Sequence, residues 1–238
     1  MNNYFIKGGY KINKKIETFD YCSEKTFWDR KHIKNSYSSQ YYVYQLAYKI
    51  ANQNKIKTIL DIGCGVATQL NHFFGKQFTI YGIDQESAIN ICKQKYNNGV
   101  FLSTNLESPT LELKSYIKTA PLIICADVIE HLADPDKLLA YIKSFADQNT
   151  IIILSTPERD LLGKSSILSP ANPYHIREWN SQEFKDYILN SSFKIKSHQI
   201  VHTCKLGFNL TTAKFIVGQL IRGSSIKYTQ VVIGNKAN

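Results

Sequence analysis

The chain has 238 residues, a formal net charge of +10 and 43% hydrophobic residues, which suit a single domain with a substantial core. No apolar run approaches ~20 residues, which excludes a membrane span, and the five cysteines are too widely spaced for a disulfide framework or a CxxC metal knuckle. The N-terminus is polar and aromatic, without the apolar core of a signal peptide, so we expect a cytoplasmic protein.

Short apolar runs alternate with helical patterns along the chain. The runs are rich in isoleucine and bounded by polar or turn residues, as strands buried on both faces should be. They cover residues 57–62, 78–84, 121–127 and 150–156. Helical patterns cover residues 37–54, 86–96 and 109–118. This alternation predicts a doubly wound α/β sandwich.

The second half of the chain carries two helix-start signals and two further strand candidates. Asp134 followed by Pro135 is typical of an N-cap with proline at the first helical position. Asn180, with a glutamate three residues later, predicts a capping box that opens a helix over 181–191. Strands are expected at about 193–203 and 227–233. No clear crossover helix separates these two strands, so we expect the last one to run antiparallel.

A glycine turn follows the first predicted strand, and an aspartate comes just before the turn. Gly63 and Gly65 follow Asp61, and a helical stretch comes next. Strand, glycine turn and helix form the nucleotide-binding arrangement of open α/β sheets. No lysine follows the glycines, which excludes a P-loop, and Thr68 replaces the third glycine of a dinucleotide fingerprint. Asp84 ends the second strand, where it would accept hydrogen bonds from a ribose diol.

Several motifs together resemble the class I S-adenosylmethionine-dependent methyltransferases. They are DIGCG (61–65), GID (82–84), ADVIEHL (126–132) and STP (155–157). The similarity extends over about residues 55–190. STPERDLLG (155–163) and NPYHIREW (172–179) further resemble a bacterial subgroup associated with glycan and small-molecule modification.

The resemblance implies a fold and a domain division. We expect a Rossmann-like, doubly wound α/β fold with a seven-stranded sheet whose last strand is antiparallel. Residues 1–54 are expected to form an N-terminal helical cap on the substrate side, and residues 55–238 the methyltransferase domain.

The resemblance also implies S-adenosylmethionine as the cofactor. The glycine turn would face its methionine moiety, Asp84 its ribose hydroxyls, and Asn105 with Leu106 its adenine. Asp61 would orient the loop or contact the cofactor through water. The expected cofactor-binding residues are Asp61, Gly63, Cys64, Gly65, Asp84, Gln85, Asn105, Leu106 and Asp127.

Four side chains are candidates for catalysis and metal binding. Glu130 and His131 lie three and four residues after Asp127, and His175 lies in a later segment that opens toward the same cleft in this fold. The pattern D-x-x-E-H with a distal histidine is similar to the metal site of small-RNA 2′-O-methyltransferases, although Asp127 is one methylene shorter than the glutamate of that family. We expect Glu130, His131 and His175 to be catalytic and, with Asp127, to bind a divalent cation such as magnesium or manganese.

Other interpretations of these four residues stay open. Asp127 and Glu130 also satisfy the D-x-x-E spacing of a capping box. His131 is compatible with a core histidine, and His175 with an exposed loop residue or a general base without metal. If a cation binds, two imidazoles and a carboxylate suit manganese, iron or cobalt better than magnesium.

The acceptor is the least determined part of the function. We favour a sugar, glycan or other small-molecule hydroxyl, with an RNA ribose 2′-hydroxyl as the alternative and a non-catalytic partner subunit as a weaker third. Residues 1–54 and 185–238 carry net charges of +5 and +7, against −2 for residues 55–184. Basic flanks suit nucleic acid, but a diffuse lysine excess is also typical of solvated surface. Trp28, Tyr42 and the apolar segment 205–226 have no assigned role, and the oligomeric state is open.

Overall fold

The structure is a computed structural model that describes residues 4–13, 28, 30–162, 168–170, 172–205 and 228–237. Its helices are α1 (Arg30–Asn35), α2 (Tyr41–Gln53), α3 (Thr68–Phe74), α4 (Glu86–Lys95), α5 (Pro135–Ser144) and α6 (Ser181–Asn190). Its strands are β1 (Thr58–Ile62), β2 (Thr79–Asp84), β3 (Gly99–Ser103), β4 (Leu122–Ala126), β5 (Ile151–Pro157), β6 (Phe193–His202) and β7 (Tyr228–Lys236). Short 3-10 helices are η2 (Glu112–Ser115), η3 (Ile129–His131) and η4 (Arg159–Leu161).

The strands form one seven-stranded sheet in the order β3-β2-β1-β4-β5-β7-β6. Strands β1 to β5 pair in parallel, while β7 lies between β5 and β6 and runs antiparallel to both. The predicted Rossmann-like sheet with an antiparallel last strand is therefore confirmed. Among the described residues, every helix is too short or too polar to cross a bilayer.

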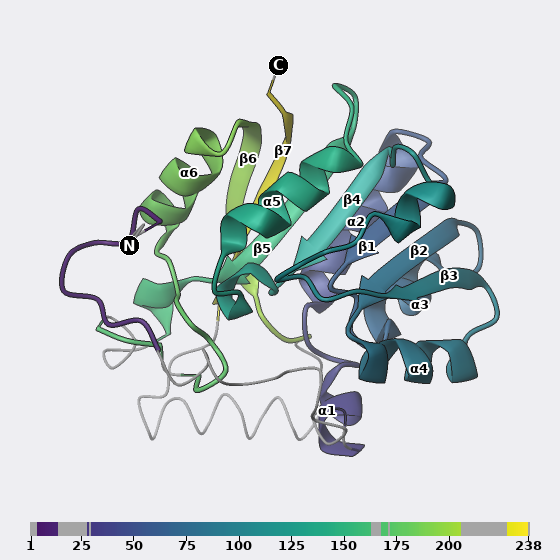
Figure 1. The fold of residues 1–238 in the computed structure, drawn as a ribbon, viewed down its shortest axis with the longest axis horizontal. Helices are drawn as coiled ribbons and strands as arrows, with labels where there is room; N and C mark the ends of the chain where they lie inside the picture. Colours follow the sequence, from purple (N-terminus) through teal and green to yellow (C-terminus); the bar gives the residue numbers. More distant parts are fainter. Residues whose placement is uncertain are drawn as a thin grey trace.

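Helices cover both faces of the sheet, as Figure 1 shows. Helices α5 and α6 pack on one face, and α2, α3 and α4 on the other. Helix α2 is part of this sandwich, because Val43 and Ala47 are fully buried in one cluster with Ile59 of β1 and Ile124 of β4. The boundary expected between residues 54 and 55 therefore separates two parts that share a core.

Most predicted elements are found close to the expected residues, with two exceptions. The segment 109–118 forms only the 3-10 helix η2, because it buries little beyond Leu113 and Ile117 and exposes Leu111 and Tyr116. Strand β3 was missed by the pattern, since only Phe101 of this edge strand is buried. The segment 206–226 lies outside the described residues.

Both helix-start signals are confirmed by hydrogen bonds. Asp134 accepts a bond from the backbone N–H of Asp136, at 3.2 Å, with Pro135 at the start of α5. Asn180 and Glu183 form a reciprocal capping box at the start of α6. These caps fix the starts of two helices that cover the sheet beside the loops described next.

Candidate functional site

A cavity of about 310 Å³ lies at the carboxyl ends of the parallel strands. Loops that follow β1, β2, β3 and β4 provide most of its wall, since parallel strands end at one edge of the sheet. Eight of the nine expected cofactor-binding residues line it: Gly63, Cys64, Gly65, Asp84, Gln85, Asn105, Leu106 and Asp127. Residues that the sequence did not point to also line it, among them Ser36, Gln40, Gln69, Thr104 and Glu107.

The glycine turn after β1 is held in a conformation that favours glycine. Gly63 has a φ of +81° and Gly65 a φ of +55°, a region that costs other residues free energy. The backbone N–H groups of Gly63 and Cys64 donate to the carbonyl of Ile83, at 2.8 and 3.1 Å. The N–H of Gly65 donates to Asp84 Oδ2, at 2.7 Å. The turn is therefore tied to the end of β2.

Asp84 has the position and the chemistry expected of a ribose-binding acid. It lines the cavity, and its Oδ1 accepts a bond from the backbone N–H of Gln85, at 2.7 Å. Burial raises the pKa of Asp84 to about 6, while the hydrogen bonds from Gly65 and Gln85 hold it lower. Each carboxylate oxygen of Asp84 already accepts one backbone hydrogen bond, which fixes the orientation of the carboxylate. The remaining lone pairs are available to the hydroxyls of a diol.

Asp61 is the expected cofactor residue that does not line the cavity. Its side chain is fully buried, and its Oδ2 accepts a bond from the hydroxyl of Tyr44, at 2.7 Å. Burial raises the pKa of Asp61 to about 7. Asp61 is thus joined to α2 through Tyr44, and its expected role in orienting the loop or contacting the cofactor through water stays a prediction. Tyr44 itself lines the cavity and was missed, because its helical spacing indicated only a core position.

Trp28 covers the glycine turn from the N-terminal side. A Cβ atom on Gly65 would lie 2.9 Å from Trp28 Cη2, so the indole packs directly on this glycine. Trp28 also lines the cavity. An isolated tryptophan ahead of the first strand carries no periodic signal, which is why the sequence left it without a role.

Asp127 lines the cavity. It is not one of the side chains whose potential metal-ligand atoms lie close together, which are Glu130, His131 and His175. It has a φ of +53°, and its Oδ1 accepts a bond from Ser155 Oγ, at 2.7 Å. Burial raises its pKa to about 6. The capping-box interpretation is wrong, because η3 has Val128 at its N-cap and no side-chain capping bond. The carboxyl of Glu130 instead accepts a bond from Thr156 Oγ1, at 3.0 Å.

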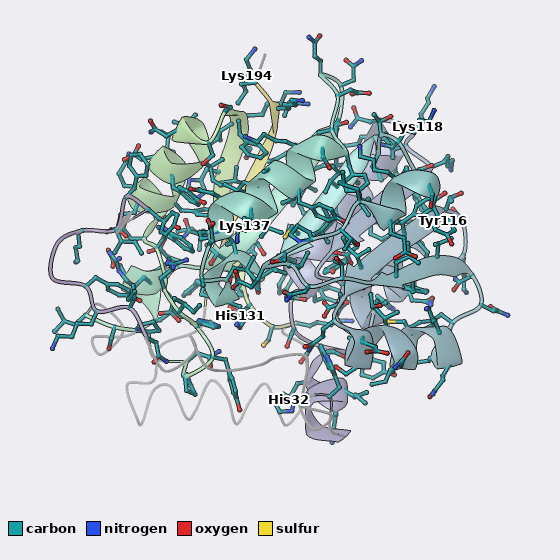
Figure 2. The ribbon with its side chains drawn as sticks, viewed as in Figure 1. His32, Tyr116, Lys118, His131, Lys137 and Lys194 are labelled. Carbon is teal, nitrogen blue, oxygen red and sulfur yellow. The ribbon has the colours of Figure 1, made fainter. Side chains whose placement is uncertain are left out.

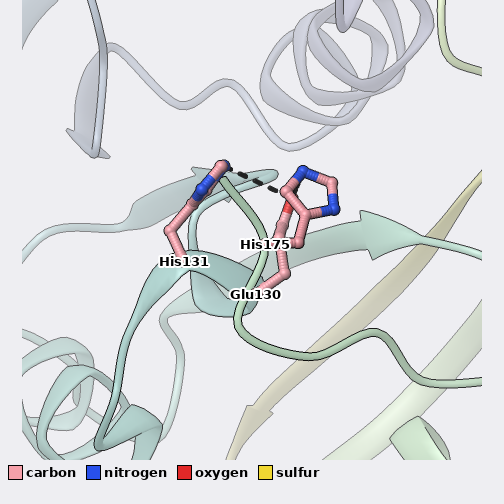
Figure 3. Close-up of side chains that lie close together, drawn as sticks. All are labelled: Glu130, His131 and His175. Carbon is pink, nitrogen blue, oxygen red and sulfur yellow. Dashed lines mark ion pairs between the residues drawn. The ribbon is translucent and has the colours of Figure 1, made fainter. Parts of the chain in front are cut away.

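Glu130, His131 and His175 converge as predicted (Figure 3). One potential ligand atom from each residue lies within 4.8 Å of the other two. Glu130 Oε1 is 3.9 Å from His131 Nε2 and 4.0 Å from His175 Nε2. These distances are too long for hydrogen bonds, and within the described part of the chain Glu130 Oε1 is buried without a hydrogen-bond partner.

The electrostatics of the cluster favour a neutral imidazole at His131. Burial, followed by the nearby His175, lowers the pKa of His131 to about 3. Burial, followed by the charge of Asp127, raises the pKa of Glu130 well above its usual value. Neutral imidazole is the form that binds a metal ion, and a cation would offset the cost of a buried carboxylate.

The cluster opens onto the cofactor cavity through His131. Glu130 and His175 are buried, whereas His131 is partly exposed and lines the cavity. In Figure 2, His131 lies near the carboxyl ends of the strands, while Lys118 and Lys194 lie toward the opposite end of the sheet. A group bound beside His131 would therefore adjoin a molecule bound on the glycine turn.

Comparisons with known proteins agree with this geometry. A profile of the methyltransferase-domain family matches residues 16–198. An enzyme of Rickettsia canadensis named ubiquinone biosynthesis O-methyltransferase is 26% identical over 73% of this chain and 75% of its own length. A probable S-adenosylmethionine-dependent methyltransferase of Mycolicibacterium smegmatis is 23% identical over 73% of the chain, which spans 62% of that relative.

Solved structures show the same fold at low sequence identity. The magnesium protoporphyrin IX methyltransferase of Synechocystis, solved with bound SAH, has a TM-score of 0.56 at 16% identity, covering 83% of each chain. A SAM-dependent methyltransferase of Aquifex aeolicus has a TM-score of 0.56 at 17% identity, covering 87% of this chain and 98% of its own.

Proposed function

Because the chain belongs to the methyltransferase-domain family, we propose that it transfers the methyl group of S-adenosylmethionine to a hydroxyl oxygen of a small molecule or sugar. The observation that carries this proposal is the Glu130–His131–His175 cluster, which opens onto the cofactor cavity through His131. The name of the Rickettsia relative, an O-methyltransferase, supports oxygen as the acceptor atom.

The residues around the cavity fit S-adenosylmethionine. Gly63 and Gly65 leave the cavity wall open where a Cβ atom would collide with Val128 or Trp28. Asp84 presents a carboxylate held by two backbone N–H groups, which suits a ribose diol. Asn105 and Leu106 line the wall beyond it, where an adenine ring would pack.

The cluster fits a divalent cation, held by Glu130, His131 and His175. The donor set consists of two imidazoles and a buried carboxylate oxygen that has no hydrogen-bond partner among the described residues. Such a set suits manganese, iron or cobalt more than magnesium. When bound, such a cation would supply Lewis acidity that eases loss of the proton from an acceptor hydroxyl. Asp127 is left out of the donor set, because its carboxyl faces Ser155.

The chain's own residues hold and orient the reactants. Methyl transfer from a sulfonium is an in-line displacement, whose rate depends on positioning and exclusion of water. The glycine turn and Asp84 hold the cofactor, and Trp28 covers the turn. His131 lies at the border of the cavity, with Nδ1 bonded to the carbonyl of Tyr174 at 2.8 Å, so Nε2 is the atom that would meet an acceptor or a cation.

A methyl-transfer assay with several acceptor classes tests this proposal. Release of S-adenosylhomocysteine would be measured with phenols, sugars and single-stranded RNA, and Asp84→Asn would serve as the cofactor-binding control. We expect turnover with a small hydroxyl compound and none in the control. Turnover with RNA alone, or RNA binding that resists a rise from about 50 to about 200 mM salt, would contradict the small-molecule assignment, since purely electrostatic binding falls steeply in that range.

A further inference from the structure

We propose that Glu178 is a positioning residue for the cluster: its carboxylate holds the Nδ1–H of His175, so that the ring keeps its lone pair on Nε2, the nitrogen that lies 4.0 Å from Glu130 Oε1. The proposal deepens the metal site proposed above and rests on it. Glu178 is not a ligand in this account. It acts through His175, as carboxylates that bind the second nitrogen of a metal-binding imidazole do in general.

The contact between Glu178 and His175 is short and buried. Glu178 Oε1 lies 2.5 Å from His175 Nδ1, and Glu178 is fully buried while His175 is nearly so. Both residues belong to the segment between η4 and α6, three positions apart. A carboxylate at this distance accepts the proton of Nδ1, which leaves the lone pair of the neutral ring on Nε2.

An independent set of contacts assigns the same tautomer. The backbone N–H of Tyr174 donates to Asn172 Oδ1, at 3.0 Å, which fixes the orientation of the Asn172 amide. The amide nitrogen Nδ2 then faces His175 Nε2, at 2.8 Å. Because Nδ2 is only a donor, Nε2 must be the acceptor, and the proton of the ring lies on Nδ1.

The backbone of Tyr174 also orients the imidazole of His131. The carbonyl of Tyr174 lies 2.8 Å from His131 Nδ1 and accepts its proton, so the lone pair of His131 is also on Nε2. Both Nε2 atoms lie within 4.0 Å of Glu130 Oε1. The Tyr174 N–H and carbonyl, with Glu178, assign both rings the tautomer with the lone pair on Nε2. On His175 that lone pair accepts the Asn172 amide N–H, which a bound cation would displace.

The backbone holds this segment in place from two sides. The N–H of Ile176 donates to the carbonyl of Glu130, at 2.9 Å, and the N–H of Asn13 donates to the carbonyl of Ile176, at 2.9 Å. The Tyr10 hydroxyl accepts the backbone N–H of Glu178, at 3.1 Å. The backbone that carries the Glu178 side chain is therefore held by contacts other than the one with His175.

The expected consequence is a loss of metal affinity when the carboxylate is removed. In the Glu178→Gln variant a neutral amide oxygen replaces the carboxylate beside Nδ1–H, so the imidazole loses the negative charge that raises its basicity as a ligand. Removing such a partner weakens metal binding by about 10- to 100-fold. Cofactor binding should not change, because the cavity wall does not include Glu178.

Calorimetric titration of the full chain with Mn²⁺ and with Co²⁺ tests the proposal in the wild type and in Glu178→Gln. Glu158→Gln is the matched control, since Glu158 is also a buried carboxylate but binds Ser181 Oγ and the N–H of Asp160. We expect about 10- to 100-fold weaker binding in Glu178→Gln only, with partial recovery in Glu178→Asp. Nitrogen-15 shifts of His175 should show a proton on Nδ1 in the metal-free wild type, and a proton on Nε2 would overturn the tautomer on which the role of Glu178 rests.

The outcomes separate this inference from the proposed function. Equal Mn²⁺ and Co²⁺ affinity in the wild type and in Glu178→Gln would overturn the role of Glu178 and leave the metal site standing. No binding of either ion to the wild type would overturn both the metal site and the role of Glu178. Retained S-adenosylmethionine binding in that case would leave the cofactor assignment intact.

Discussion

Replacing Gly63 with alanine should damage the cofactor site through two separable effects. The first is backbone strain, because Gly63 has a φ of +81°, where a Cβ atom costs about 1–2 kcal/mol. The second is a collision, since that Cβ would lie 2.3 Å from Val128 Cγ2, and overpacking of this kind costs about 1–3 kcal/mol. The sum is about 2–5 kcal/mol of unfolding free energy.

The collision also affects function. Gly63 and Val128 both line the cavity, and Val128 lies between Asp127 and the 3-10 helix that carries His131. Relief of the collision would shift this loop. We therefore expect Gly63→Ala to weaken S-adenosylmethionine binding at least about tenfold, a loss of about 1.4 kcal/mol.

Two other glycines provide matched controls. Gly9 has a φ of +88° with nothing within 4 Å of an added Cβ, so Gly9→Ala carries the backbone effect alone. Gly8 has neither a positive φ nor a close neighbour, so Gly8→Ala should be close to neutral. Unfolding in urea and calorimetric titration with S-adenosylmethionine would be measured for all three variants, for Val128→Ala, and for Gly63→Ala combined with Val128→Ala.

The double variant decides whether the reasoning is right. Shortening Val128 removes the atoms that collide, so the two changes should be non-additive by about 1–3 kcal/mol. If Gly63→Ala costs no more stability than Gly9→Ala, or if it adds to Val128→Ala within about 0.5 kcal/mol, the steric argument is refuted. Wild-type cofactor affinity in Gly63→Ala would refute the placement of the cofactor on this turn.

Three further predictions concern the buried acids and the cluster. Tyr44→Phe should cost about 1–3 kcal/mol by removing the donor to Asp61, and more at pH 8 than at pH 5, as thermal unfolding at the two pH values would show. Asp61 has a pKa of about 7 in the folded chain against 3.8 for an ordinary aspartate, so its contribution to stability falls as pH rises between those values. The Tyr44 hydroxyl lowers the pKa of Asp61, so without it the fall should continue to higher pH. An equal cost at both pH values would contradict this. Calorimetry should show that Asp84→Asn loses cofactor affinity with folding intact. The affinity of the wild type for the cofactor should fall as pH drops below about 6, where the Asp84 carboxylate becomes protonated. An affinity that does not change with pH would exclude the ionised carboxylate as the acceptor of the ribose hydrogen bonds. Exhaustive chelation and His175→Ala should each lower methyl transfer and leave cofactor binding unchanged, and full turnover after chelation would leave His131 or His175 as an ordinary general base.

Local sequence patterns were enough for the fold and for the cofactor turn. The isoleucine-rich runs, the proline and capping signals of α5 and α6, and the glycines after β1 act over a few neighbouring residues, so each is readable along the chain. The carboxyl ends of parallel strands meet at one edge, which is why Gly63 and Asp84 were predicted to share a site, whereas Asn105 was assigned to it by the resemblance to class I methyltransferases. Edge strand β3 was missed, and the helix expected over 109–118 is only the short η2, because both segments bury few side chains.

The roles of individual acids and rings were decided by the tertiary structure. Asp61 and Asp127 both follow the strand pattern of cofactor residues, yet Asp61 accepts a hydrogen bond from Tyr44 and Asp127 accepts one from Ser155 on the neighbouring strand β5. The D-x-x-E spacing of Asp127 and Glu130 predicted capping equally well, and it is excluded because η3 begins after Val128 without a side-chain capping bond.

The sequence alone predicted that Glu130, His131 and His175 form one site, but it did not predict which residues orient their side chains. Glu178, Asn172 and the backbone of Tyr174 act on these side chains through single hydrogen bonds. Such bonds depend on the placement of atoms to within a fraction of an ångström, and the one from His131 joins segments far apart in the chain. Spacing in a sequence predicts which residues share a face or an edge. It carries no information on tautomer or hydrogen-bond direction, because those depend on the three-dimensional position of the partner atom.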